Sequence, residues 1–397
     1  MTILSPDQSR AFETIERWAR SPDSDLLTFG GYAGTGKTTL VSELAKELKT
    51  KRIAFCAPTG RAAAILAKKL EAAGVDITER NLCSTVHSLT AIPVEDLETG
   101  EVNAWKQKST IGEYDLIVVD EASMVGSELY AMLAQHSIPI LAVGDHAQLP
   151  PVGSSLNLMA DPMVRLEHIH RQAAESPILR LAESVRNGEA LEPWGIDCPE
   201  VQFRTKSDWQ RVLSLHYPNW MTAPEHLERV VLTLTNRVRN IFNREVRSVL
   251  RRGESPENGD LVVCLKNIKP SGVFNGYRGI FEPTYMGDVD TIRGEVEFPA
   301  EKQWLFGKFN RYQFGRAKTF GRYDELAEHG MVVTNWVEAG YLFDFAYAMT
   351  VHKAQGSEWP LVVLALEGRP GWMSRKDYQR WLYTAVTRAS EKLILLG

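Results

Sequence analysis

Residues 31–38 read GYAGTGKT, and this octapeptide constrains the fold more than any other part of the sequence. It matches the pattern G-x-x-x-x-G-K-T, between an apolar run at 26–29 and an amphipathic stretch at 38–48. Glycines in such a loop let successive backbone N–H groups point at phosphate oxygens, at a helix N-terminus whose dipole favours anions. The sequence therefore predicts a strand–loop–helix unit of an α/β fold that binds a nucleotide. The flanking strand and helix argue against the alternative of a glycine-rich turn without a ligand.

Two polar residues of the loop and two carboxylates further on predict the chemistry of this site. Lys37 can reach the β- and γ-phosphates, and the Thr38 hydroxyl can ligate Mg²⁺. The run LIVVDE at 116–121 predicts a buried strand that ends in Asp120, a Mg²⁺ ligand through water, and Glu121, the base for the attacking water. We expect ATP and Mg²⁺ as cofactors, phosphoryl transfer to water, and nucleotide contacts from Gly34, Thr35, Gly36, Lys37, Thr38 and Thr39.

Short apolar runs divide the 397 residues into two α/β lobes. Continuous runs of four to seven apolar residues are typical of strands that are buried on both faces of a parallel sheet. They recur in two sets, at 26–29, 53–57, 116–120 and 138–144, and again at 230–234, 361–366 and 393–397. We expect the first lobe at 1–160, and the second at 161–255 and 339–397.

Two insertions interrupt these lobes. Residues 89–108 contain an acidic-Thr-Gly turn between short extended segments, which predicts a β-hairpin in the first lobe. Residues 256–338 alternate polar and apolar side chains, contain several glycine turns and lack helical periodicity. This pattern predicts a small β-rich insertion in the second lobe.

The sequence Ser5-Pro6-Asp7-Gln8 predicts the start of a helix. Ser5 is a typical N-cap, Pro6 fits the first turn, and Gln8 completes a capping box. A glutamine amide can also match both a donor and an acceptor on an adenine edge. Gln8 is therefore a helix cap or a nucleotide contact.

Six further motifs, in order along the chain, resemble those of superfamily 1 DNA helicases. The resemblance to motifs Ia, Ib, II, III, V and VI lies in APTGRAA (57–63), STVHSL (84–89), DEASM (120–124), LAVGDHAQLPPVG (141–153), TVHKAQGSEW (350–359) and YTAVTRA (383–389). The H-K-A-Q-G element, with SPIL at 176–179 and VRNG at 185–188, is similar to the 5′-to-3′ branch, the Dda/RecD-like group. The resemblance implies two RecA-like lobes with parallel sheets, a β-hairpin pin at 89–108 and an SH3-like β-barrel at 256–338.

The resemblance also implies roles in hydrolysis. Gln148 would sense the γ-phosphate or the attacking water from the first lobe. Arg171 and Arg388 would come from the second lobe as arginine fingers, because a guanidinium stays charged and spreads over transition-state oxygens; pairing with surface acids is the alternative for both. Gly356 and Glu358 are expected at the nucleotide, where Glu358 bonds the ribose or stabilises its own loop.

Contacts to DNA are expected in both lobes. Hydroxyl and imidazole groups that follow strands can donate to phosphate oxygens, although a structural role is the alternative for each histidine. The residues that the resemblance places on DNA are Pro58, Thr59, Thr85, His87, Asn236, Thr350 and His352. Trp105, with Ile92 and Pro93, belongs to the hairpin that resembles a strand-splitting pin.

A net charge of −5 denies the chain a global attraction to nucleic acid, so a local basic track is required. Two stretches fit, at 229–252 and at 302–323, each with a local charge of +6. The second stretch also interleaves aromatic residues with these charges, among them Trp304, Phe306, Phe309, Tyr312 and Phe314. These aromatics either stack on bases or form the core of the small barrel.

The sequence thus predicts an ATP-dependent helicase that moves 5′ to 3′ on single-stranded DNA and unwinds duplex as its two lobes close and open. A translocase that strips proteins from DNA with little unwinding is the first alternative, and a nucleotide-dependent switch or small-molecule kinase is the second. Expected partners are single-stranded DNA, 5′-tailed duplex, and a single-strand-binding protein or a replication or recombination factor. Because the N-terminus is unlike a signal peptide and no apolar run reaches about 20 residues, we expect the protein in a bacterial or phage-infected host cytoplasm. We also expect a monomer.

Overall fold

The computed structural model describes residues 4–78, 80–95, 102–168, 176–189, 198–268, 271–284, 289–333 and 335–397. The chain divides into two compact units. Unit 1 comprises residues 1–93 and 105–189, and unit 2 comprises residues 94–104 and 190–397. In the described part of the chain, no helix combines the length and the apolar character needed to cross a bilayer.

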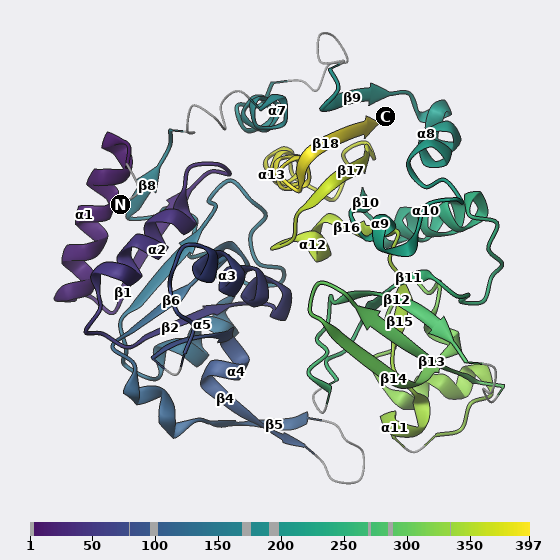
Figure 1. Cartoon of the computed structure of the whole chain (residues 1–397), viewed down its shortest axis with the longest axis horizontal. Coiled ribbons are helices and arrows are strands. Elements are labelled where there is room, and N and C mark those ends of the chain that lie inside the picture. Colours follow the sequence, from purple (N-terminus) through teal and green to yellow (C-terminus); the bar gives the residue numbers. More distant parts are fainter. Residues whose placement is uncertain are drawn as a thin grey trace. The chain divides into compact units, whose positions relative to one another are not determined.

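Unit 1 is built on a six-stranded parallel sheet with the strand order β3-β2-β6-β7-β1-β8 (Figure 1). Its strands are β1 (Leu26–Gly31), β2 (Ile53–Ala57), β3 (Asn81–Thr85), β6 (Leu116–Val119), β7 (Ile140–Gly144) and β8 (Val164–Leu166). Its helices are α1 (Pro6–Arg20), α2 (Lys37–Glu47), α3 (Gly60–Ala72), α4 (Val86–Thr90), α5 (Ser127–Ala134) and α7 (Pro177–Arg186), with 3-10 turns η1 (Ser109–Glu113) and η2 (Ala122–Met124). β4 (Ala91–Glu95) and β5 (Val102–Gln107) pair as a separate two-stranded sheet within the insertion expected at 89–108. We expected this insertion in the first lobe, but its residues 94–104 are grouped with unit 2.

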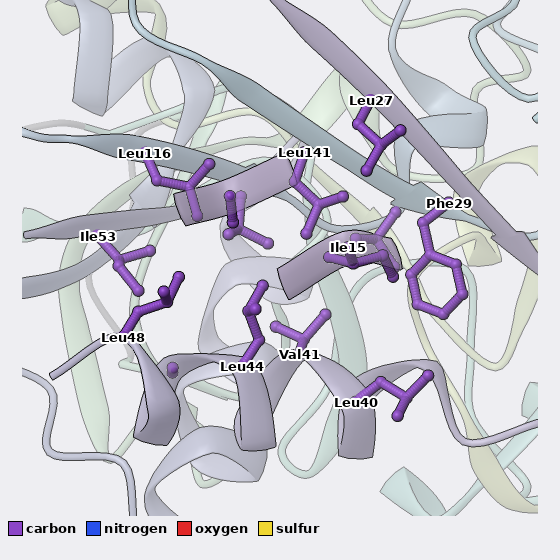
Figure 2. Packing of buried hydrophobic residues seen from close by; sticks show 14 of the residues in the cluster. Ile15, Leu27, Phe29, Leu40, Val41, Leu44, Leu48, Ile53, Leu116 and Leu141 are labelled. Carbon is purple, nitrogen blue, oxygen red and sulfur yellow. The ribbon is translucent and has the colours of Figure 1, made fainter. Parts of the chain in front are cut away.

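Both faces of this sheet are buried, which explains the continuous apolar runs of its strands. On one face, alternate strand residues pack against α1 and α2; Figure 2 shows Leu27 and Phe29 of β1 beside Ile15, Leu40 and Leu44 of those helices. The intervening strand residues pack on the opposite face with side chains of α4 and α5. Unit 1 is therefore a three-layer α/β unit.

The first unit is longer than the sequence predicts. We expected its end at residue 160, but β8 pairs in parallel with β1, and α7 also belongs to unit 1, which extends to Glu189. The strand β8 has only three residues, with an exposed Arg165 between two buried ones, so it gives no apolar run in the sequence.

Unit 2 contains a second parallel sheet with the order β16-β10-β17-β18-β9. Its strands are β9 (Val201–Arg204), β10 (Arg229–Thr233), β16 (Ala348–Thr350), β17 (Trp359–Ala365) and β18 (Ala389–Leu396). Its helices are α8 (Trp209–His216), α9 (Ala223–Leu227), α10 (Asn236–Val249), α12 (Val351–Ala354) and α13 (Arg375–Val386), with the 3-10 turn η3 (Lys206–Asp208). The two parallel sheets confirm the predicted α/β fold class.

Four of the five strands of an antiparallel sheet in unit 2 lie in the interval 256–338 that we predicted to be β-rich, and the fifth, β15 (Phe343–Phe345), lies beyond it. The order of the sheet is β14-β13-β12-β11-β15, formed by β11 (Asp260–Cys264), β12 (Arg278–Pro283), β13 (Thr291–Phe298), β14 (Gln303–Asn310) and β15. Tyr341, just before β15, bridges to Phe309 of β14 and closes the sheet on itself. The short helical segments η5 (Arg311–Gln313), η6 (Tyr323–His329) and α11 (Trp336–Ala339) follow β14. Phe281, Phe298, Phe309 and Phe343 fill the interior of this closed sheet.

Candidate nucleotide and nucleic-acid site

The carboxyl edge of the unit 1 sheet collects most of the residues that the sequence predicts for this unit. Because all its strands are parallel, the segments that follow them emerge at one edge, which is where open α/β sheets bind ligands. The loop 31–38 follows β1, Asp120 follows β6, and Gln148 follows β7. Thr59 and Thr85 stand at the ends of β2 and β3, where Ala57 and Thr85 are paired in register. Nucleotide and DNA candidates of unit 1 thus share an edge.

The phosphate loop has the backbone that its glycines predict. Gly34 and Gly36 have φ of 78° and 87°, a left-handed conformation that favours glycine, and Gly36 is the N-cap of α2. The ammonium group of Lys37 donates to the carbonyl oxygens of Gly31 at 2.6 Å and Tyr32 at 3.0 Å. The loop therefore curls around the amine that we expect to contact phosphate.

Gln8 is a helix cap, as predicted. Its backbone N–H donates to Ser5 Oγ, and its side-chain Oε1 accepts from the Ser5 backbone at 3.0 Å, which completes the capping box. The amide Nε2 also donates to the carbonyl of Thr35 at 3.0 Å. One buried side chain thus ties the start of α1 to the phosphate loop. A contact with adenine stays a prediction.

Asp120 and Glu121 directly follow the buried strand β6, and Glu121 has a left-handed backbone conformation. Burial raises the pKa of Asp120, while the backbone N–H of Glu121 and the ammonium of Lys37 act in the opposite direction. This influence of Lys37 indicates that amine and carboxylate share one electrostatic environment. Glu121 has φ of 52°, which is uncommon for a residue with a side chain and occurs most at functional sites.

Gln148 and Gly144 bring the segment after β7 against the segment after β6. A Cβ on Gly144 would lie 3.0 Å from the backbone nitrogen of Ser123 and 2.9 Å from Met159 Cγ, so only glycine allows this approach. The side chain of Gln148 is buried, and its Oε1 has no hydrogen-bond partner among the described residues. A buried amide oxygen without a partner is costly, which fits a polar ligand such as a water at this position.

Three residues that the sequence did not single out contact one another at the phosphate loop. Tyr32, inside the loop, packs against the His146 ring with centroids 4.4 Å apart. The guanidinium of Arg186, at the end of α7, lies 3.6 Å from the centroid of the Tyr32 ring. This cation–π contact joins two residues that are 154 positions apart, so no local pattern announces it.

Unit 2 places its predicted residues at two opposite edges of its sheet. Asn236 and Thr350 lie at the carboxyl ends of β10 and β16, where Thr233 and Thr350 are paired in register. His352 follows in α12, and burial lowers its pKa. Gly356 and Glu358 come just before the amino end of β17, where Trp359 pairs with Ala389. The DNA candidates and the nucleotide candidates of unit 2 are therefore separated by the height of the sheet.

Arg388 lies at the amino edge and is held inside its own unit. Its guanidinium donates to Thr384 O at 3.0 Å, Ser357 O at 3.0 Å and Thr387 Oγ1 at 3.2 Å. The bond to Ser357 ties the segment YTAVTRA to the loop that contains Gly356 and Glu358. A guanidinium has five N–H groups, so two remain for other acceptors.

Threonines cap the helices that begin at the DNA candidates. Thr59 and Thr85 are the N-caps of α3 and α4, and each side chain accepts from a backbone N–H. Thr350 is the N-cap of α12, but its hydroxyl makes no capping bond. Pro58 and His87 are half-buried beside the first two caps. Arg171 lies outside the described residues, as do the side chains of Trp105 and Pro93.

The comparisons with known proteins agree with this arrangement. A model described as an AAA domain matches residues 3–197, and a UvrD-like helicase C-terminal domain matches residues 345–396. The ATP-dependent RecD2 DNA helicase of Deinococcus radiodurans is 29% identical over 94% of this chain and 47% of its own length. The ATP-dependent DNA helicase dda of phage T4 is 24% identical over 69% of this chain and 63% of its own. A crystal structure of Pif1 helicase from Bacteroides with ADP-AlF3 and single-stranded DNA superimposes with a TM-score of 0.57, at 19% identity, over 100% of this chain and 92% of that one.

The chain belongs to the Dda and RecD group of superfamily 1 helicases. With the Pif1 helicase it shares the fold. The AAA-domain match ends at residue 197, close to the end of unit 1 at Glu189, so it supports the longer first unit. The UvrD-like match contains β16, β17 and β18, and with them the DNA candidate at the carboxyl end of β16 and the nucleotide candidates at the amino ends of β17 and β18. The chain spans about half the length of its Deinococcus relative.

The basic stretch at 229–252 is largely structural, in contrast to its predicted role as a DNA track. Arg239 pairs with Asp344 at 2.8 Å, and Arg247 pairs with Asp260 at 3.0 Å, all four side chains being buried. These carboxylates are distant in sequence, so the local charge of +6 overstates the charge that the surface presents. The pairs connect α10 of the α/β sheet to β11 and β15 of the closed sheet.

The aromatic residues at 302–323 divide between buried and exposed positions, and stacking of the exposed ones on bases stays a prediction. Along β14, Phe309 is fully buried in the closed sheet, whereas Trp304 and Phe306 are 59% and 67% exposed. Phe314 packs against the same core, and Tyr312 donates a hydrogen bond to Asp290. The alternation of a strand explains the division, because residues 304 and 306 point to the face opposite 305 and 309.

Proposed function

We propose that this chain is an ATP-driven DNA helicase that moves 5′ to 3′ along single-stranded DNA. The coupling of ATP to DNA is supported by unit 1, where the phosphate loop, Asp120, Glu121 and Gln148 lie at the same ends of the strands as the DNA candidates Thr59 and Thr85. The 5′-to-3′ polarity rests on the resemblance of the H-K-A-Q-G element at 352–356 to that branch. A small-molecule kinase has no use for the second set of DNA candidates at Asn236 and Thr350.

Residues of unit 1 supply the chemistry of hydrolysis. The Thr38 hydroxyl and the Asp120 carboxylate are hard oxygen ligands that fit Mg²⁺, which neutralises charge on the β- and γ-phosphates when bound. Among the described residues, no group of three or more His, Cys, Asp or Glu side chains could hold a metal, so phosphate oxygens and water would complete the coordination. Lys37 binds the same phosphates, Glu121 takes the proton of the attacking water, and the free Oε1 of Gln148 orients that water.

Two arginines complete the site for ATP hydrolysis in this proposal. Arg388 of unit 2 has two N–H groups left for other acceptors, at the amino ends of the strands of its sheet. Arg171, which the resemblance assigns to the second lobe, falls within the residue range of unit 1 and is a second candidate finger. ATP favours a closed arrangement of the units because Arg388 of unit 2 binds the nucleotide only when the units are closed. Gly356 and Glu358 contact the nucleotide from the same edge, and hydrolysis releases the closed arrangement.

The remaining parts of the chain guide DNA. The two-stranded sheet of β4 and β5 acts as a pin that splits duplex, with Trp105 at the junction, and the closed antiparallel sheet is an SH3-like barrel. Pro58, His87, Asn236 and His352 join the threonines on the backbone of the single strand. The chain works as a cytoplasmic monomer with a single-strand-binding protein or a replication or recombination factor.

Duplexes with a single-stranded tail test the proposal. With ATP and Mg²⁺, the chain is expected to unwind a duplex with a 5′ tail and to leave a duplex with a 3′ tail intact. Unwinding from the 3′ tail alone would reverse the polarity.

The short strands of the hairpin, five and six residues, favour one second candidate, a translocase that removes proteins from DNA. Displacement of streptavidin from a biotinylated single strand, without unwinding of either tailed duplex, would select this candidate.

A further inference from the structure

Trp372 lies on a loop between β17 and α13 and is 73% exposed. The loop itself is well anchored. Met373 is buried, its backbone N–H donates to Pro370 O at 3.0 Å, and its carbonyl accepts from Arg369 at 2.7 Å. Tyr378 of α13 donates to the carbonyl of Glu367 at 2.7 Å and fixes the base of the loop. The structure thus presents a large aromatic side chain to solvent on a fixed turn.

The loop itself is positively charged, and together with the flanking Glu367 and Asp377 the residues 367–377 carry a net charge of +1. Residues 368–376 read GRPGWMSRK, with three exposed cations, Arg369, Arg375 and Lys376, and no acid. The acids that flank it are engaged in hydrogen bonds within the fold. Glu367 accepts from Leu234 N, Thr235 N and Thr235 Oγ1, and Asp377 bonds to Ser374. Cations next to an exposed aromatic ring are the composition that binds single strands, since phosphates meet the cations and a base stacks on the ring.

The position of the loop matches the DNA candidates of unit 2. It follows the carboxyl end of β17, at the same sheet edge as Thr350 and Asn236. The contact is direct, because the Glu367 carboxylate holds Thr235, the N-cap of α10, at 2.8 Å from its hydroxyl. A strand that contacts Asn236 therefore passes next to this loop.

We propose that Trp372 is a stacking platform for a base of the single strand and that Arg369, Arg375 and Lys376 bind the adjacent phosphates. The site rests on the proposed function, since it extends the DNA contacts of Asn236 and Thr350 along the same edge. It is independent of nucleotide, and it tolerates any base because every base offers an aromatic face.

Substitution of Trp372 in the full chain tests the stacking. Trp372→Ala is expected to weaken binding to a fluorescein-labelled dT oligonucleotide roughly tenfold in an anisotropy titration, whereas Trp372→Phe keeps most of the affinity. Trp220→Ala is the matched control: Trp220 is 76% exposed, has no charged residue in 217–224, and precedes the amino end of β10. Equal affinities for wild type, Trp372→Ala and Trp220→Ala would overturn the proposal.

Two further measurements separate stacking from other roles of the loop. The fluorescence of the wild type minus that of Trp372→Phe is expected to be quenched by the dT oligonucleotide, and an unquenched difference spectrum contradicts stacking. The double variant Arg375→Gln, Lys376→Gln is expected to lower the slope of log K against log salt by about 1.4, at about 0.7 for each lost phosphate contact; an unchanged slope contradicts the phosphate contacts. Failure of the wild type to bind the oligonucleotide would refute the proposed function itself, whereas wild-type binding without an effect of Trp372 would refute only the platform.

Discussion

The two parallel sheets differ in which ends of their strands carry the candidate residues. Unit 1 has its nucleotide candidates and its DNA candidates at the carboxyl edge of one sheet. Unit 2 has Asn236 and Thr350 at the carboxyl edge, and Glu358 and Arg388 at the amino edge. The threonines differ as well, because Thr59 and Thr85 of the first unit cap helices with their hydroxyls, whereas Thr350 of the second does not.

In unit 2, one segment of chain connects the candidates at the carboxyl ends of the strands with those at the amino ends. The segment 350–358 begins at the carboxyl edge and ends at the amino edge, and it is buried at Gln355 and Ser357. Ser357 accepts a hydrogen bond from Arg388. Residues 350–357 therefore connect the DNA candidate Thr350 to the carbonyl that accepts from Arg388. In unit 1, neighbouring loops make this connection directly, as the approach of Gly144 to Ser123 illustrates.

We expect the largest effect from a change of Arg388, at the amino ends of the strands of unit 2. Arg388→Lys is expected to reduce kcat for DNA-stimulated ATP hydrolysis about a thousandfold, because a lysine cannot replace the planar fork of an arginine finger. Affinity for single-stranded DNA without nucleotide stays within about threefold, since the DNA candidates lie at the other edge. A variant that hydrolyses ATP normally but binds DNA poorly would reverse the assignment of the two edges.

The joint between the two sheets of unit 2 gives the next largest effect. Asp260→Asn leaves Arg247 and Arg252, which both pair with Asp260, opposite a neutral amide. We expect it to lower the free energy of unfolding by about 3–5 kcal/mol in urea denaturation. The control Asp324→Asn breaks an exposed pair with Arg322 and is expected to cost less than about 1 kcal/mol. Equal costs would mean that the buried pairs do not hold the sheets together.

Gly144→Ala tests the common edge of unit 1. Its Cβ would lie 3.0 Å from the backbone of Ser123, so we expect a loss of about 1–3 kcal/mol of stability. We also expect weaker ATP hydrolysis and weaker DNA binding together, because both sets of residues share this edge. Gly112→Ala is the control, since a Cβ there meets no atom within 4 Å. Loss of only one activity would separate the two sets.

The smallest effect is expected at the carboxyl edge of unit 2. Thr350→Val keeps the shape of a buried side chain and removes its hydroxyl. We expect the Kd for a dT oligonucleotide to rise roughly tenfold, the cost of one hydrogen bond to a charged phosphate. An unchanged Kd in anisotropy titrations would move the DNA contact away from this edge.

The sequence predicted the parts of this molecule that depend on local patterns. Gly34 and Gly36 need only a turn of defined φ, Ser5 and Gln8 need only a capping spacing, and β2 appears as an uninterrupted apolar run over Ile53–Ala57. Parallel pairing then brings the ends of such runs to one edge without further information.

Long-range pairs were not predictable in the same way. The buried arginines of α10 look like a DNA track until Asp260 and Asp344 are placed beside them. The contact of Arg186 with Tyr32 and the three-residue strand β8 leave no local signal either. The split of Trp304 from Phe309 was available, because a period of two along β14 separates them.

ATP hydrolysis by the full chain, measured with and without a dT oligonucleotide in wild type and Lys37→Ala, tests the central claim most directly. We predict that DNA stimulates hydrolysis by the wild type, that Lys37→Ala lowers turnover by at least about a hundredfold, and that this variant still binds the oligonucleotide. Hydrolysis that DNA does not stimulate, or stimulation that survives in Lys37→Ala, would contradict a DNA motor driven from the phosphate loop.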